Sequence, residues 1–196
     1  MNVLNPVLMP ALGALAILGL DLLSRADARD GRQRVLAGIR LGAVAVLSLM
    51  GVAFTLAWGP RSSREGLLDV DGFGLFGVGF VVVAGALVLS LSLTHFGMAR
   101  SRPAEPLALL LFSWAGAMAA IVTDHLVVLL VALELAWLPM IALVAIDSRR
   151  LSSSESSLKA FFAHVFASLV FAHGLAFLYG ATGRLDFGAL GGEGVT

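Results

Sequence analysis

The chain has 196 residues, of which 59% are apolar and only 13% carry a charge. Soluble domains are about 25% charged, so this composition excludes a water-soluble enzyme and predicts a protein that lies in a membrane. Thirteen basic residues balance thirteen acidic ones, which leaves no field to attract nucleic acid, and the lack of cysteine excludes disulfides, thiolate catalysis and cysteine-bound metal clusters.

Six apolar segments are predicted to cross a bilayer as helices. About 20 residues span a hydrocarbon core roughly 30 Å thick. The long apolar stretch from Leu107 to Ile146 contains one polar break at residues 123–125, which is predicted to be a surface turn between two spans. The apolar runs are continuous rather than alternating, so no strands are expected. We therefore predict an all-α, polytopic transmembrane helix bundle with helices at about 6–23, 38–58, 72–94, 107–123, 126–146 and 155–182.

No separate soluble domain is expected outside these helices. Residues 183–196 contain five glycines and are predicted to form an unstructured, glycine-rich tail. No basic cluster precedes the first apolar run, so a cleaved signal peptide is not expected.

A glycine pattern at the start of the third helix has the letters of a dinucleotide-binding fingerprint. Gly72-Phe-Gly-Leu-Phe-Gly77 fits it by spacing alone. The fingerprint requires a preceding strand and an acidic residue about 20 positions on, whereas here it opens a 23-residue apolar span. Small residues that let helices approach closely are the better interpretation.

Basic loop residues predict the orientation of the chain in the membrane. Ten lie in or beside the first, third and fifth loops, and three lie on the opposite side. Because basic residues concentrate on the cytoplasmic side, the odd-numbered loops are expected in the cytoplasm and both termini in the periplasm.

Glu134 places a carboxyl group inside the fifth predicted helix, about 12 Å from one end and about 18 Å from the other. A charge at that depth costs several kcal/mol unless it is paired, hydrated or protonated. Two interpretations stay open: a group that takes up and releases a transported proton, or a neutral glutamic acid hydrogen-bonded between helices. Pro139 lacks an N–H, so it removes the helical donor of the Leu135 carbonyl and predicts a helix kink beside Glu134.

Lys159 is the chain's only lysine, and lysine can lose its proton when desolvated whereas arginine effectively cannot. The preceding Ser152-Ser-Ser-Glu155 resembles a capping box and predicts a helix start at Ser152. The alternative for Lys159 is a surface residue paired with Glu155 four positions earlier.

His173 lies near the middle of the sixth predicted helix, at a depth similar to that of Glu134. Its spacing of 14 residues from Lys159 places the two on one helix face. We predict a proton relay of Glu134, Lys159 and His173 that runs through waters, with an interhelical hydrogen bond as the alternative for His173. His164 falls on the opposite face and is interpreted as structural.

Four motifs in chain order carry a family resemblance. They are Val70-Asp-Gly-Phe73, Leu133-Glu-Leu-Ala-Trp-Leu-Pro139, Ser154-Glu-Ser-Ser-Leu-Lys-Ala-Phe161 and Leu178-Tyr-Gly-Ala-Thr-Gly183. Together they resemble the N-terminal part of subunit N, the antiporter-like proton-translocating membrane subunit of NADH-quinone oxidoreductase (complex I).

The resemblance implies that Glu134 corresponds to a proton-channel glutamate of helix five and Lys159 to a lysine of helix six. It implies no counterpart for His173. Further lysines of the family and the second of its two inverted helix repeats lie beyond Thr196. The chain is therefore expected to be a fragment, or a split or degenerate subunit, that forms no complete channel alone.

The function implied by the resemblance is proton translocation coupled to electron transfer, in a subunit with no redox centre of its own. No cofactor or metal is expected in this chain, because NADH, flavin, iron–sulfur clusters and quinone would bind partner subunits. Other membrane subunits and the lipid of a bacterial plasma membrane are the expected partners. The alternatives are a subunit of a multi-subunit cation/proton antiporter or membrane-bound hydrogenase, or a structural or assembly piece of such a complex.

Overall fold

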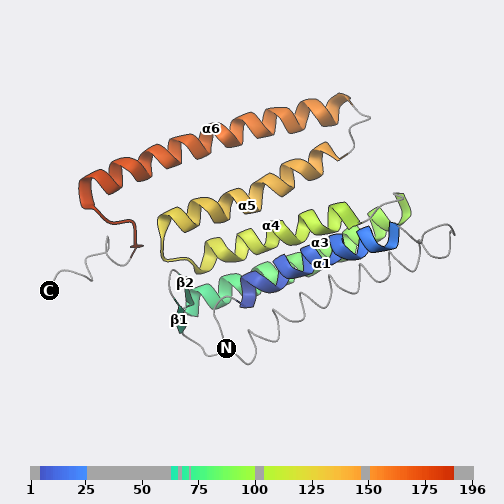
Figure 1. The fold of residues 1–196 in the computed structure, drawn as a ribbon, viewed down its shortest axis with the longest axis horizontal. Helices are drawn as coiled ribbons and strands as arrows, with labels where there is room; N and C mark the ends of the chain where they lie inside the picture. The colour runs from blue at the N-terminus through green and yellow to red at the C-terminus, as the bar shows by residue number, and fades with distance from the viewer. Residues whose placement is uncertain are drawn as a thin grey trace.

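The computed structural model describes five helices, which are joined side by side in an elongated bundle. In Figure 1, α6, α5 and α4 follow one another across the molecule, and α1 and α3 lie on the far side of α4. The described residues are 5–25, 63–65, 68–70, 72–99, 104–146 and 151–187. The helices are α1 (Asn5–Arg25), α3 (Gly72–Ala99), α4 (Ala104–Val122), α5 (Leu126–Ala145) and α6 (Leu151–Thr182).

Four of these helices, α3 to α6, are long and apolar enough to cross a membrane. The all-α, polytopic architecture predicted from composition is therefore present in the described part of the chain. The predicted helix at 38–58 lies outside the described residues. The structure divides the long apolar stretch into α4 and α5 at Thr123–His125, where the surface turn is predicted. Helix α6 begins at Leu151, one residue before the predicted start at Ser152.

A short antiparallel hairpin corrects the expectation that the chain has no strands. β1 (Ser63–Glu65) pairs with β2 (Leu68–Val70) just before α3. The hairpin is missed because each strand has only three residues, too few for an alternating pattern to be visible. It lies between helices and leaves the helical architecture unchanged.

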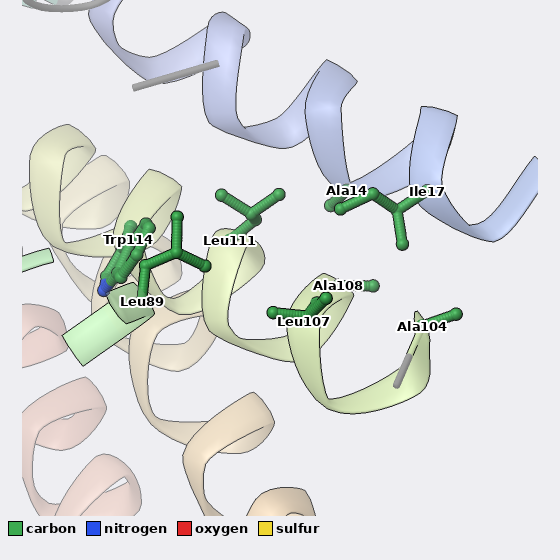
Figure 2. Packing of buried hydrophobic residues seen from close by; sticks show 8 residues of the cluster. All are labelled: Ala14, Ile17, Leu89, Ala104, Leu107, Ala108, Leu111 and Trp114. Atoms are coloured by element: carbon green, nitrogen blue, oxygen red, sulfur yellow. The ribbon is translucent and has the colours of Figure 1, made fainter. Parts of the chain in front are cut away.

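The apolar core is centred on α4. Figure 2 shows Ala14 and Ile17 of α1 and Leu89 of α3 packed around side chains of α4. The α4 members of this cluster are Ala104, Leu107, Ala108, Leu111 and Trp114. Because α1 and α3 both pack on α4, this helix is the centre of the core.

Small residues allow the helices around α4 to approach closely. A Cβ atom built on Gly77 of α3 would lie 2.9 Å from the Cγ2 atom of Ile121 on α4. A larger side chain at Gly77 would therefore displace Ile121. This contact supports the packing interpretation at Gly77, whereas a Cβ atom built on Gly72 would meet no atom within 4 Å.

α5 and α6 carry many apolar side chains that no other described residue covers. Those with more than half of their surface exposed are Val131, Trp137, Leu151, Leu158, Phe162, Phe166, Leu169, Val170, Phe177 and Tyr179. An apolar surface of this extent suits contact with lipid or with other transmembrane helices, rather than with water.

The first residues after α6 fold back onto the start of α5. Gly183 has a φ of +68°, the left-handed conformation that commonly ends a helix. The N–H of Leu126 then donates to the Leu185 carbonyl at 2.9 Å, and the N–H of Phe187 donates to the Asp124 carbonyl at 3.0 Å. The first of these bonds uses a backbone donor at the start of α5 that has no acceptor within the helix, and the second uses the carbonyl of Asp124 just before it. The expectation of an unstructured tail therefore does not hold for this part of it.

Candidate functional site

α5 has a close-packed side that faces α4. A Cβ atom built on Gly116 of α4 would lie 2.4 Å from the Ala136 nitrogen and 2.7 Å from the Ala132 oxygen. The backbones of α4 and α5 therefore meet directly at Gly116. One turn earlier on α4, the Ser113 hydroxyl donates to the Ala136 carbonyl at 2.8 Å. α5 is thus fixed on α4 along this side.

Glu134 points in the opposite direction, toward α6. It lies between Ala132 and Ala136 in sequence, and a step of two residues turns an α-helix by about 200°. Its Oε2 atom is 2.9 Å from Nε2 of His164, and its Oε1 atom accepts a hydrogen bond from the Ser168 hydroxyl. Both carboxyl oxygens of Glu134 are therefore bound by α6.

The site lies inside the helix pair. Glu134 is about 12 Å along α5 from Leu126. The Glu134 side chain is 30% exposed and that of His164 is 13% exposed. The Trp137 ring lies beside His164, with ring centroids 6.1 Å apart. A carboxyl group, an imidazole and a hydroxyl thus form a small polar cluster between apolar helices.

The cluster is suited to holding a proton rather than a metal. The distance between Glu134 and His164 fits either a carboxylate–imidazolium ion pair or a carboxylic acid bonded to a neutral imidazole, because hydrogen positions follow from the bonding partners. Among the described residues, no group of three or more His, Asp or Glu side chains is arranged to hold a metal ion.

Pro139 is buried within α5, which continues through it as one helix to Ala145. The interhelical bond from Ser113 to the Ala136 carbonyl lies in the same turn of α5. This part of α5 therefore has a polar tie to α4 as well as the link from Glu134 to α6.

Lys159 is found on the surface of α6, with 75% of its side chain exposed. Its Nζ atom lies 2.6 Å from Oε1 of Glu155, one turn earlier, and Glu155 is 67% exposed. This contact is the surface pair with Glu155, four positions earlier, that the sequence spacing predicts as the alternative to a relay role for Lys159.

His173 is exposed on α6, and its Nδ1 atom lies 2.8 Å from the Leu169 carbonyl oxygen. A carbonyl only accepts, so Nδ1 carries the hydrogen. His173 is nine residues from His164, or about half a turn away around the helix. The structure therefore brings Glu134 together with His164 and Ser168, and it does not bring Lys159 or His173 to that carboxyl group.

Two residues of this cluster were not recognised as a site from the sequence. His164 was assigned a structural role, and Ser168 carries no motif. The available signal was their spacing: they are polar residues one turn apart, on the α6 face opposite His173. A carboxyl group inside the preceding apolar helix requires such a polar face nearby.

Comparisons with known proteins agree on one family of membrane proteins. Residues 123–193 match the family described as NADH:quinone oxidoreductase/Mrp antiporter, TM. The chain is 37% identical over 132 residues to NADH-quinone oxidoreductase subunit N of Deinococcus radiodurans, which covers 67% of this chain and 26% of that protein.

Solved structures give a similar result for the fold. A chain of respiratory complex I from Thermus thermophilus with bound aureothin superimposes with a TM-score of 0.70 and 25% identity, over 93% of this chain and 38% of that chain. A chain of the archaeal membrane-bound sulfane sulfur reductase superimposes with a TM-score of 0.62 at 21% identity, over 92% of this chain and 37% of that chain. The second likeness concerns the fold alone. The chain spans between 26% and 38% of the length of these proteins.

Proposed function

The chain is a homologue of complex I subunit N, an antiporter-like membrane subunit, and on this premise we propose that it belongs to a proton-translocating part of a respiratory NADH:quinone oxidoreductase. In this proposal Glu134 is the residue that takes up and releases the transported proton. The chain carries out no redox chemistry. NADH, flavin, iron–sulfur clusters and quinone bind other subunits of the complex.

The observation that carries the proposal is the position of Glu134. Its carboxyl group lies well inside an apolar helix pair and is bound at both oxygens by α6. An ionisable group at such a depth is costly, and such groups in membrane proteins mark ion and proton pathways. The adjacent imidazole and hydroxyl groups give the carboxyl group polar partners in both of its protonation states.

The proposal also gives the membrane in which the protein lies and its orientation there. The chain lies in a bacterial plasma membrane among other membrane subunits, with both termini in the periplasm. A cysteine introduced at Ser63 is then labelled by an impermeant reagent from the periplasmic side. Labelling of Ser63→Cys only from the cytoplasmic side would reverse the orientation and leave the proposed function intact.

A second candidate is a subunit of a cation/proton antiporter. The description of the matching family names both kinds of protein. The two candidates differ in their driving reaction, because an antiporter exchanges a cation for protons without NADH. Proton movement in membrane vesicles that depends on a sodium gradient, and not on NADH, would favour the antiporter.

Glu134→Gln tests the proposed function in the assembled complex. Glutamine keeps the size and hydrogen bonding of the side chain but cannot release a proton. We expect assembly to survive, and the number of protons moved per NADH oxidised to fall severalfold. Vesicles with a pH-sensitive dye and an NADH-oxidation assay measure both quantities.

Two further results complete this test. Glu134→Asp keeps the carboxyl group but sits about 1.5 Å short, a gap that one water can bridge, so its pumping should be intermediate. Normal pumping by a fully assembled Glu134→Gln complex would end the proposal. Glu134 would then be a neutral link between α5 and α6.

A further inference from the structure

His164 is the ionisable side chain that contacts Glu134 among the described residues, and it faces α5 rather than the outside of the bundle. Its Nε2 atom lies 2.9 Å from Glu134 Oε2, and its side chain is 13% exposed. The two residues come from different helices, 30 positions apart. An imidazole in this position is more than a space-filling residue, because it carries two nitrogen atoms that can each hold a proton.

We infer that Glu134 and His164 act as one proton-exchanging pair, in which the imidazole delivers the proton to the carboxylate. This inference rests on the proposed function and names a second participant in it. Ser168 is a positioning residue in the pair, because its hydroxyl holds Oε1 and leaves Oε2 directed at the ring.

The transfer within the pair is a single proton shift, and water is the proton donor and acceptor outside the pair. The cycle begins with a carboxylate on Glu134 and a neutral imidazole whose Nε2–H donates to Oε2. A proton arrives at Nδ1 of His164 and makes an imidazolium. The Nε2–H proton then moves to Oε2, which leaves a neutral carboxylic acid and a neutral imidazole with its hydrogen on Nδ1. The acid proton then passes to water, and the ring gives its Nδ1 hydrogen to water and takes a proton from water at Nε2, which restores the starting state.

The pair also limits the charge that the membrane interior must hold. With one exchangeable proton, the pair is neutral overall, either as two neutral groups or as an ion pair. With none, it carries a single negative charge, which the hydroxyl of Ser168 and the ring N–H of His164 both stabilise through hydrogen bonds. A lone carboxylate between apolar helices would lack that stabilisation.

The geometry separates this pair from the other candidates on α6. Lys159 binds Glu155 at the surface, and His173 lies about half a turn around the helix from His164. Neither residue contacts the carboxyl group of Glu134 in the described contacts. His164 is thus the side chain of α6 that can exchange a proton with Glu134 directly.

His164→Gln tests the inference in the assembled complex. The glutamine amide reaches the position of Nε2 and still donates a hydrogen bond to Glu134, but it cannot carry a proton. We expect assembly to survive and the protons moved per NADH oxidised to fall severalfold. The double variant Glu134→Gln with His164→Gln should move as many protons per NADH as the single variant that pumps less. The effects of the two substitutions do not add, because the two residues act as a unit.

The outcomes separate the inference from the proposed function. If His164→Gln pumps like the wild type while Glu134→Gln is severalfold impaired, the pair is wrong and the role of Glu134 stands. If both variants assemble and pump normally, the proposed function fails together with the pair. Should His164→Gln fail to assemble, His164→Asn, which keeps an amide and leaves room for a water, is judged by the same two outcomes.

Ser168 supplies a test of positioning. Ser168→Ala removes the hydroxyl that holds Oε1, and we expect about a twofold loss of pumping, equivalent to about 0.4 kcal/mol in the barrier. Ser168→Thr keeps a hydroxyl and should restore most of the activity. Loss in both variants, with reduced assembly, would show that this position serves packing only and would remove Ser168 from the inference.

Discussion

α5 meets its two neighbours in opposite ways. Toward α4 it presents Ala132 and Ala136, and the backbones touch at Gly116. Toward α6 it presents Glu134, whose two carboxyl oxygens are bound by side chains of α6. One side of the helix is therefore a close contact of small residues, and the other is a polar contact that carries ionisable groups.

The difference assigns separate roles to the two sides. Transmembrane helices associate through close van der Waals packing, so the Gly116 contact holds α5 in place. The polar side depends on that support, because a carboxyl oxygen must be held at hydrogen-bond distance from its partner, about 2.6–3.2 Å between heavy atoms, to exchange a proton. Changes on the α4 side should thus affect assembly, and changes on the α6 side should affect proton movement.

The largest effect is expected at Gly116. Gly116→Ala adds a Cβ atom 2.4 Å from the Ala136 nitrogen, so α5 must move away from α4. Overpacking of this kind costs about 1–3 kcal/mol or more, and we expect the amount of assembled complex to fall severalfold. Native gel electrophoresis of solubilised membranes measures this amount.

Gly180→Ala is the matched control for that variant. Gly180 lies on α6 with no atom within 4 Å of the position of an added Cβ. Its replacement should leave assembly close to wild type. Equal losses at both positions would show that helix glycines matter through backbone flexibility, and the packing contrast between the two sides of α5 would fail.

The sequence predicts that α5 carries a carboxyl group inside an apolar span, but it does not predict which side chains of α6 contact that group. Length and apolarity predict α5 as a span, and the position of Glu134 predicts a carboxyl group well inside it. The 3.6-residue repeat of the α-helix places His164 and His173 on opposite faces of α6. It cannot say which face meets α5, because the rotation of one helix against another is decided by packing across the whole interface.

The same limit explains the other differences. Gly116 looks like any small residue in a span, and only the approach of α5 makes it special. The return of residues 183–187 to α5 is made by backbone hydrogen bonds and by His125, whose Nε2 atom lies 3.9 Å from Oδ1 of Asp186, and a contact between residues so distant in sequence has no local pattern. The relay predicted through Lys159 and His173 relied on a shared face of α6, and His173 lies about half a turn around that helix from His164, which contacts Glu134.

A smaller effect on assembly is expected at Ser113. Ser113→Ala removes the hydroxyl bond to the Ala136 carbonyl, which is 2.8 Å long and partly buried. The loss of one such bond costs about 0.5–1.5 kcal/mol, so the complex should assemble and inactivate at a slightly lower temperature. Residual NADH oxidation after heating measures the shift.

Ser90→Ala is its control. The Ser90 hydroxyl also donates to a backbone carbonyl, that of Leu87 at 2.8 Å, but within its own helix and at the surface. Removing it should leave the inactivation temperature close to wild type. A larger shift for Ser90→Ala than for Ser113→Ala would contradict the view that the tie between α4 and α5 stabilises the bundle.

The smallest effect is expected at Lys159. Its side chain is 75% exposed and pairs with Glu155 at the surface of α6, and exposed pairs of this kind contribute about 0.3–0.5 kcal/mol. Lys159→Ala should therefore leave assembly unchanged and weaken pumping less than Glu134→Gln does. Glu155→Ala, which removes the same pair, should match it. If Lys159→Ala instead reduces pumping as strongly as Glu134→Gln while Glu155→Ala does not, Lys159 acts on the proton path through neighbours outside the described residues, and the polar side of α5 is then only part of that path.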